Sequence, residues 1–219
     1  MTAISPFYGL SFAAGCVDAI FFVGFRGVFT ANMTGNTVLL GIAIASRFGA
    51  VPRALGIVPP LVAIAAFVVG GIVALPVFRA GFDPRRAAGI VLGEGALVAV
   101  ASVAFDGLRN DAVVTFCIVL VSFAMGAQSV VASKAGLPGI STTYVTGTLV
   151  TAITRGLSAG SDDRDHKDAT RALWTWTAYL LGATAGTLFF LALQRAALWP
   201  ATVLFLAMAA WLDRSRRGT

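Results

Sequence analysis

Long apolar segments recur along the whole chain and constrain its fold more than any other feature. Eight can be marked, and six of them have the length and hydropathy of ordinary membrane helices. These six lie at 6–25, 57–78, 87–105, 112–133, 172–193 and 197–212. A helix needs about 20 mostly apolar residues to cross the hydrocarbon of a bilayer. The sequence therefore predicts an all-α integral membrane protein with six to eight transmembrane segments, forming a single transmembrane domain over residues 1–219.

Composition excludes the other classes of chain. Apolar residues make up 58% and charged residues 12%, whereas soluble domains carry about 25% charged residues. A soluble enzyme, a disordered chain and a disulfide-rich secreted domain are therefore excluded. The net charge of +6 indicates membrane topology and contact with anionic lipid. The predicted partners are the lipid bilayer and a small-molecule or ion substrate. No nucleic acid and no cofactor is predicted, and a homo-oligomer is left open.

The two remaining apolar segments, 28–46 and 140–157, each begin with a polar half. The first reads FTANMTGNT and the second STTYVTGT. Irregular backbone at membrane depth is tolerated only where it is buried in protein or lines a wet cavity. Both segments are therefore predicted to be broken or re-entrant helices. A helix that starts inside the membrane presents free N–H groups and the positive end of its dipole to a ligand.

The two broken segments are similar to each other and lie 112 residues apart. The matching positions of the first are Gly27, Thr30, Thr34, Gly35, Val38 and Ser46, and those of the second are Gly139, Thr142, Thr146, Gly147, Val150 and Ser158. SFAAG at 11–15 also recurs as SFAMG at 122–126, and FVVGG at 67–71 as YLLGA at 179–183. A near-constant offset predicts an internal duplication, with repeat one at about 6–106 and repeat two at about 112–213.

The distribution of basic residues favours inverted repeats. If each broken segment enters and leaves the membrane on the same face, 11 of the 16 basic residues lie on the same side of the membrane as both termini. If all eight segments cross, the division is 10 against 6. The positive-inside rule therefore favours cytoplasmic termini. Full crossing with an unwound middle stays open and would make the repeats parallel.

The polar loop 158–170 would share the cytoplasmic side. Asp168 or Thr170 is expected to cap the helix that follows it. The aromatic residues Trp174, Trp176, Tyr179 and Trp211 are expected to form a belt at the cytoplasmic interface.

The polar halves of the broken segments are the predicted substrate site. The candidate residues are Asn32, Thr34, Gly35, Asn36, Thr37, Thr142, Thr143, Thr146, Gly147 and Thr148. Two helix N-termini favour a small anion or a polar metabolite that carries a carboxylate. The alternative is that Thr and Gly only permit close helix packing. Because both halves are broken at equivalent positions, a binding site near the midplane is favoured.

Two carboxylates inside predicted helices are candidate ion-coupling residues. Asp18 shares a helix face with Ser11 and Gly15. It would bind a proton or Na⁺, or instead hydrogen-bond the backbone of the broken segment. Glu94 lies among glycines, where a polar contact on a close-packed face is favoured over a proton relay. The single histidine, His166, lies in the polar loop, so no catalytic or metal site is predicted and the chain is expected not to be an enzyme.

The motifs GxxDA at 15–19 and FxANMTGNT at 29–37 resemble those of the YoaK-like bacterial membrane proteins, a family without an assigned function. The resemblance implies a multi-pass protein of the bacterial inner membrane and supplies no substrate. From the site, the expected function is that of a small secondary transporter. The alternatives are an uncoupled channel or facilitator, and a non-transporting scaffold or sensor. The last would use the GxxxG faces at 89–93 and 182–186 to bind partner helices.

Overall fold

A computed structural model describes residues 5–49, 56–107, 110–137, 142, 145–157 and 162–214. Within these ranges all regular secondary structure is helical, which confirms the all-α part of the predicted fold class. The helices are α1 (Ser5–Gly24), α2 (Met33–Ala45), α3 (Val58–Ala74), α4 (Pro84–Gly107), α5 (Asp111–Ala135), α6 (Val145–Gly156), α7 (Asp163–Leu193) and α8 (Trp199–Arg214). The 3-10 turns are η1 (Ser46–Phe48), η2 (Leu75–Phe78) and η3 (Gln194–Leu198).

Five stretches of the described chain are long and apolar enough to cross a membrane. They are Ser5–Gly24, Val58–Phe78, Pro84–Asp106, Asp111–Ala135 and Asp163–Arg214. The last stretch holds α7 and α8, separated at η3, where Gln194 has a φ of 52°. The 13 residues of α2 and the 12 of α6 extend about 20 Å and 18 Å, short of the about 30 Å of hydrocarbon. Neither helix spans a bilayer by itself.

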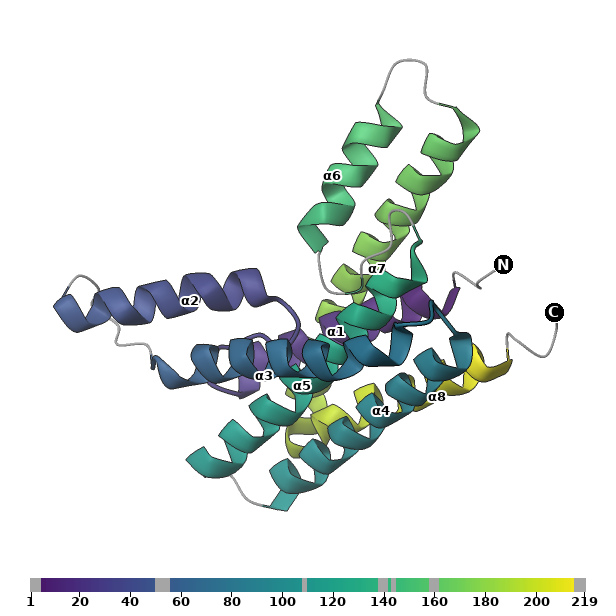
Figure 1. Ribbon diagram of the computed structural model, residues 1–219. Coiled ribbons are helices and arrows are strands. Elements are labelled where there is room, and N and C mark those ends of the chain that lie inside the picture. The colour runs from purple at the N-terminus through teal and green to yellow at the C-terminus, as the bar shows by residue number, and fades with distance from the viewer. Residues whose placement is uncertain are drawn as a thin grey trace.

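Three long helix pairs build the bundle. α1 packs along α7, α3 along α5, and α4 along α8 (Figure 1). The apolar core lies mainly between α1, α4, α5 and α8. There the rings of Phe21 and Phe25 stack with centroids 4.2 Å apart, and Phe25 meets Phe105 of α4 at 4.1 Å. The two cysteines, Cys16 and Cys117, are buried and free.

Glycines allow α1 and α7 to cross with their backbones in contact. A Cβ on Gly15 would collide with the carbonyl of Tyr179, and a Cβ on Gly182 with the carbonyl of Phe12. Gly186 likewise lies against the backbone of α1. The GxxxG face at 182–186 is therefore used inside the molecule, and the expectation that it binds a partner helix is wrong.

The crossing of α3 and α5 is built in the same way. Gly70 lies against the backbone of Phe123, and Gly126 lies against the backbone of Phe67. By contrast, Gly89 and Gly93 of α4 are exposed, and a Cβ on either would meet no atom within 4 Å. Of the glycines around Glu94, only Gly95 packs closely within the chain, against Leu206 of α8, so the expected close-packed face does not extend to Gly89 and Gly93.

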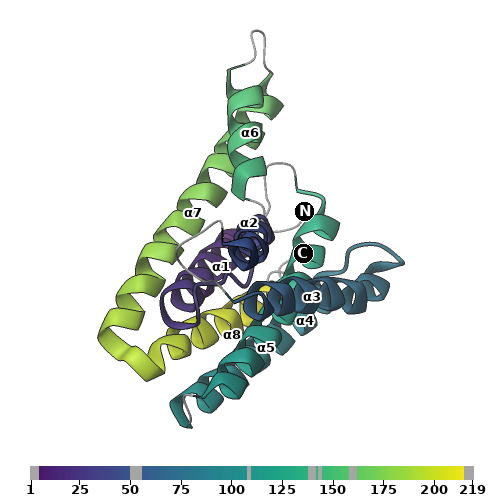
Figure 2. The same ribbon diagram turned by 90° about the vertical axis from the view of Figure 1, so that its left-hand side faces the viewer.

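α7 begins earlier than hydropathy predicts. Asp162 caps it by accepting hydrogen bonds from the N–H groups of Asp165 (3.0 Å) and Arg164 (2.9 Å). The bond from Asp165 is the main reason that the pKa of the Asp162 carboxyl lies below its usual value. The predicted caps, Asp168 and Thr170, lie within the helix instead. The polar stretch thus lengthens α7, which forms with α6 a hairpin extending from the bundle (Figures 1 and 2).

Candidate functional site

Two asparagines shape the break between α1 and α2. The side chain of Asn36 pairs with the backbone of Phe29: its Oδ1 accepts from the Phe29 N–H at 2.9 Å, and its Nδ2 donates to the Phe29 carbonyl at 2.6 Å. Asn32 caps α2 by accepting from the N–H of Gly35 at 3.0 Å. These two side chains therefore supply hydrogen-bond partners to backbone groups of the break and of the first turn of α2. Buried backbone groups outside regular secondary structure need such partners.

The carboxylate of Asp18 anchors the same break from α1. Its Oδ1 accepts from the N–H groups of Thr30 and Ala31, both at 2.6 Å, and from the Thr30 hydroxyl at 3.1 Å. Its Oδ2 accepts from the N–H of Asn32 at 3.0 Å and from the Tyr179 hydroxyl of α7. All five partners donate, and a carboxylate offers about four lone-pair sites. The group is thus fully engaged within the protein.

The face of α1 that carries Asp18 lies against α7. The hydroxyl of Ser11 donates to the carbonyl of Thr175 at 2.9 Å, and Gly15 meets the backbone of Tyr179. Tyr179 is thus drawn into the bundle, so the expectation that it belongs to an interfacial belt is wrong. Arg26 pairs with Asp111 at the start of α5 rather than with Asp18.

A cavity of about 240 Å³ lies where the two broken segments meet. Its described lining residues are neutral: Ala31, Asn32, Met33, Thr34, Phe67, Ser129, Val145 and Thr146. The first turn of α2 and the first turn of α6 therefore border one space. Thr34 and Thr146, which lie 112 residues apart in the sequence, both face it.

The structure divides the nine described members of the predicted site into two groups. Asn32, Thr34 and Thr146 line the cavity, whereas the other described members do not. Thr37 and Thr148 direct their hydroxyls to carbonyls of their own helices, at 2.9 Å and 2.6 Å. Gly35 packs against the ring of Phe29, and the side chain of Asn36 is bonded to the backbone of the break. Gly147 lies in the first turn of α6, and Thr142 is fully buried. Thr143 lies outside the described residues.

Glu94 lies apart from the cavity, in α4. It is 2% exposed, and neither carboxylate oxygen has a hydrogen-bond partner among the described residues. A charged carboxylate without a partner is costly inside a membrane protein. Within the described parts of the chain, no cluster of three or more His, Cys, Asp or Glu side chains is placed to bind a metal ion.

Comparison with known proteins decides the family. Residues 7–211 match the protein family of unknown function DUF1275. The chain belongs to this family. It is 36% identical over 142 residues to the UPF0700 transmembrane protein YoaK of Bacillus subtilis (strain 168), a match that covers 64% of this chain and 61% of the relative. The match therefore spans less than two thirds of the relative's length. The resemblance found in the sequence is confirmed. No solved structure matches the chain.

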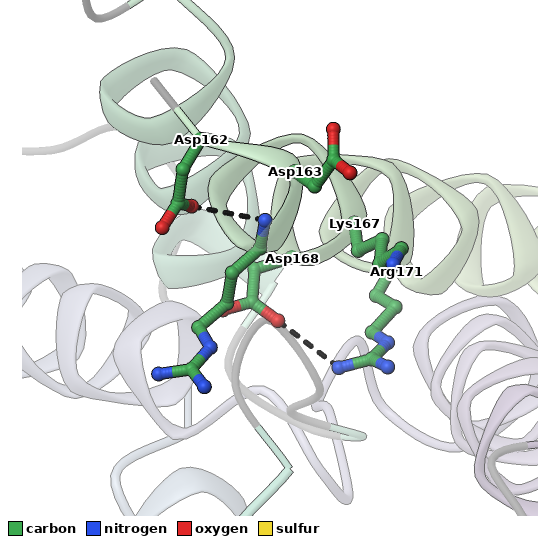
Figure 3. A pocket seen from close by; sticks show the side chains of 6 residues that line it. Asp162, Asp163, Lys167, Asp168 and Arg171 are labelled. Carbon is green, nitrogen blue, oxygen red and sulfur yellow. Dashed lines mark hydrogen bonds and ion pairs between the residues drawn. The ribbon is translucent and has the colours of Figure 1, made fainter. Parts of the chain in front are cut away.

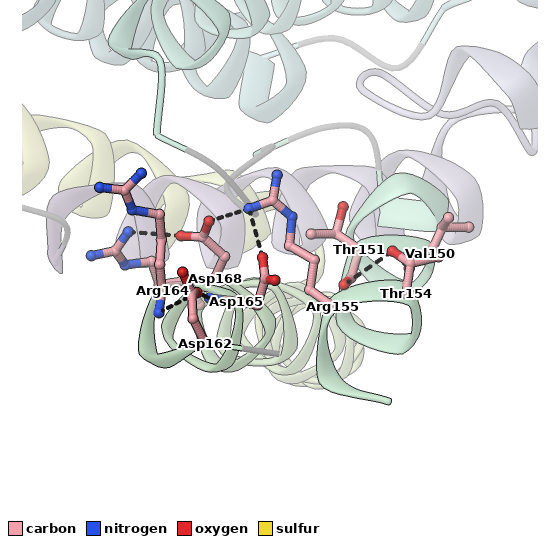
Figure 4. A network of polar contacts seen from close by, with 9 residues as sticks. Val150, Thr151, Thr154, Arg155, Asp162, Arg164, Asp165 and Asp168 are labelled. Atoms are coloured by element: carbon pink, nitrogen blue, oxygen red, sulfur yellow. Dashed lines mark hydrogen bonds and ion pairs between the residues drawn. The ribbon is translucent and has the colours of Figure 1, made fainter. Parts of the chain in front are cut away.

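In this DUF1275 chain, a charged network joins α6 to the polar start of α7. Asp168 is 1% exposed and accepts from Arg171 at 3.0 Å and from Arg155 of α6 (Figure 4). The Nη1 atom of Arg155 also lies 3.6 Å from the Oδ1 atom of Asp165. An open hollow of about 730 Å³ beside the network is lined by charged side chains of α7 and its cap (Figure 3). The network explains why the hairpin forms although its α7 arm is polar.

Proposed function

We propose that the chain is a small secondary transporter whose substrate binds in the cavity between α2 and α6. The observation that carries the proposal is the shared cavity: two short helices, from positions 112 residues apart, turn their first residues toward one space. Broken helices in both halves of a membrane protein mark substrate sites in known transporters. The volume of about 240 Å³ lies below the about 300–1,000 Å³ of sites for drug-sized ligands, which supports a small polar metabolite or anion.

The proposal includes an internal duplication with inverted halves. The glycine contacts support it, because two contacts in one crossing have counterparts in the other. Gly15 against Tyr179 corresponds to Gly126 against Phe67, and Gly182 against Phe12 corresponds to Gly70 against Phe123. The first helix of each half thus packs on the third helix of the other half. With α2 and α6 re-entering, three crossings per half would invert one half relative to the other.

The two candidate ion-coupling residues receive different roles. Asp18 is a positioning residue, because its oxygens are occupied by the break and by Tyr179. Glu94 is the candidate coupling group, since its buried carboxyl has no such partners among the described residues. A proton neutralises a carboxyl in such a place at little cost. The substrate and the coupling proton would therefore occupy separate parts of the bundle.

The proposed function is tested by counterflow in proteoliposomes. Purified protein is reconstituted and assayed with a panel of labelled monocarboxylates of two to five carbons. We expect saturable exchange that Thr146→Phe reduces by about tenfold or more, because the larger side chain fills the cavity. Thr154→Phe, on an exposed turn of the same helix, is the matched control. Conductance without counterflow would favour the channel, and exchange unaffected by Thr146→Phe would reject this site.

The same vesicles test the role of Glu94. With an imposed pH gradient, uptake by the unmodified protein should exceed the uptake without a gradient. Glu94→Gln keeps the size of the side chain and removes the titratable proton. We expect this variant to retain counterflow and to lose the stimulation by the gradient. Stimulation that persists in Glu94→Gln would remove Glu94 from the coupling step.

Topology gives an independent prediction. If α2 and α6 re-enter, the loop at Asp83 and the start of α7 at Asp163 lie in the cytoplasm with both termini. Reporter fusions at Asp83 and Asp163 should therefore both give cytoplasmic signals. An external signal at Asp83 with a cytoplasmic one at Asp163 would indicate full crossing by both broken segments and parallel repeats.

A further inference from the structure

Two buried polar side chains on neighbouring helices, Glu94 of α4 and Gln128 of α5, have incomplete hydrogen bonding. Glu94 is 2% exposed and Gln128 is 0% exposed. The Nε2 of Gln128 donates to the carbonyl of Leu10 in α1 at 3.3 Å. Its Oε1 has no hydrogen-bond partner within the described ranges, and the same holds for both carboxylate oxygens of Glu94. The free atom of Gln128 is therefore an acceptor that needs a donor.

The register of α4 and α5 brings these two side chains to one level. The helices are consecutive antiparallel neighbours (Figure 1), and the Sγ of Cys117 donates to the carbonyl of Ala101 at 3.5 Å. Glu94 lies two turns before Ala101 on the same face of α4, and Ala124 lies two turns after Cys117 on the same face of α5. Glu94 is therefore level with Ala124, one turn from Gln128. Because helical side chains lean toward the N-terminus of their own helix, those of Glu94 and Gln128 lean toward each other.

Both side chains also face α1. Gln128 reaches Leu10 of that helix. Glu94 lies on the buried stripe of α4 that ends at Phe105, whose ring meets that of Phe25 with centroids 4.1 Å apart. The other members of this stripe are apolar: Val91, Val98 and Ala101. A metal ion needs several oxygen ligands, whereas a proton on Glu94 needs only one acceptor. The surroundings therefore favour a proton.

The titratable and charged groups of the surrounding elements are placed elsewhere. Asp18 of α1 is bonded to the break, and Cys16 lies where α1 crosses Gly186 of α7. Cys117 of α5 lies two turns away from the level of Glu94. The others lie toward the ends of their elements: Tyr8 of α1, Arg85, Arg86 and Asp106 of α4, Asp111 and Lys134 of α5, Arg195 of η3, and Asp213 and Arg214 of α8. The polar group that the register places beside the carboxyl is thus a neutral amide.

We propose that the proton of Glu94 is donated to the Oε1 of Gln128, and that this amide links the protonation of Glu94 to α1. The inference rests on the proposed function, in which Glu94 is the coupling group. With the proton bound, Gln128 accepts from Glu94 and donates to Leu10. When the proton passes to water, the carboxylate can only accept. The amide then turns its Nε2 toward Glu94 and releases the carbonyl of Leu10.

α1 connects this exchange to the substrate cavity. Asp18 lies about 12 Å further along the helix than Leu10, and it anchors the N–H groups of Ala31 and Asn32. Both of these residues line the cavity. A change in the bonding of α1 therefore acts on the segment that carries the proposed site. Two alternative bonding states of one amide are what coupling between separate sites requires.

Infrared spectroscopy of the purified protein tests the bond between the two side chains. Difference spectra between low and high pH contain the C=O band of each carboxyl that titrates, and the band that Glu94→Gln removes belongs to Glu94. We expect Gln128→Leu to shift this band, because the carboxyl loses its acceptor. Ser122→Ala is the matched control, since Ser122 is a buried polar residue on another face of the same helix, and it should leave the band in place.

Vesicles test the link to transport. Gln128→Leu should lower the ratio of uptake with a pH gradient to uptake without one, and Ser122→Ala should not change this ratio. A Glu94 band that stays in place in Gln128→Leu, or equal shifts in both variants, would overturn the inference. If Gln128→Leu does not fold, Gln128→Glu replaces it. Two facing carboxyls share a proton, so the Glu94 band should then titrate in two steps, and an unchanged single step would contradict the inference.

Failure of this inference is distinguishable from failure of the proposed function. If the band shifts as expected while the unmodified protein shows no counterflow, the transporter proposal fails and the bond between Glu94 and Gln128 stands. If counterflow is stimulated by the gradient to the same extent in Gln128→Leu as in the unmodified protein, the transporter proposal stands and Gln128 has no part in coupling.

Discussion

Asp18→Ala is expected to lower the free energy of unfolding by about 3 kcal/mol or more. The N–H groups of Thr30 and Ala31 are buried and would lose their acceptor, as would the Tyr179 hydroxyl. Each unpaired buried donor costs about 1–3 kcal/mol. Denaturant titration of the purified protein in detergent measures the loss. Asp18→Asn should also destabilise the protein, because the NH₂ group of the amide would replace one carboxylate oxygen and face hydrogen-bond donors.

Tyr179→Phe is the matched control for this effect. It removes one donor to a charged acceptor, worth about 1.5–3 kcal/mol, and leaves the three backbone bonds to Asp18 in place. Tyr179→Phe should therefore lower the free energy of unfolding by less than Asp18→Ala does. If Asp18→Ala unfolds like the unmodified protein and alters only the ion dependence of uptake, Asp18 is a coupling residue and its assigned role as an anchor is incorrect.

Gly126→Ala is expected to destabilise the protein by about 1–3 kcal/mol, the usual cost of overpacking. The added Cβ would collide with the backbone of Phe67, so α3 and α5 would have to separate. Gly93→Ala is the matched control, since it lies in another long helix and has no atom within 4 Å of the new Cβ. In an open helical position this change is neutral or stabilises by up to about 1 kcal/mol.

The contrast between the two glycines tests the crossing itself. A thermal midpoint that falls for Gly126→Ala and not for Gly93→Ala supports backbone contact between α3 and α5. Equal midpoints would mean that the crossing is looser than described. The correspondence between the glycine contacts of the two crossings, which supports the duplication, would then lack the contacts of α3 with α5.

The apolar helices could be predicted closely because charged and glycine residues bound them. The segment expected at 112–133 is α5 (Asp111–Ala135), and the one expected at 6–25 is α1 (Ser5–Gly24). The start of α7 could not be predicted in this way. Its first two turns are held by the Asp162 cap and by ion pairs to Arg155, and hydropathy does not register a helix that is stabilised by charges.

The site was predictable only in part, for a similar reason. The broken segments can be recognised from local sequence, and so can the backbone of the break as a candidate partner of Asp18. A carboxylate inside a membrane helix needs hydrogen-bond donors, and the start of a helix after a break has unpaired backbone N–H groups. Tyr179, 161 residues away from Asp18, is brought there only by the crossing of α1 and α7. The different environments of Gly93 and Gly126 likewise depend on which helix faces each of them, and one sequence does not contain that information.

Cross-linking in native membranes tests most directly whether the two broken segments meet. Cysteines are introduced at Thr34 and Thr146, and a protease site is inserted between α4 and α5, so that only a cross-link keeps the halves joined after cleavage. The control pair is Thr34 with Thr154, which lies about 12 Å further along α6. A short bifunctional thiol reagent should join the halves through Thr34 and Thr146 and not through the control pair. Failure of the first pair, or equal yields for both, would contradict a shared cavity and with it the proposed substrate site.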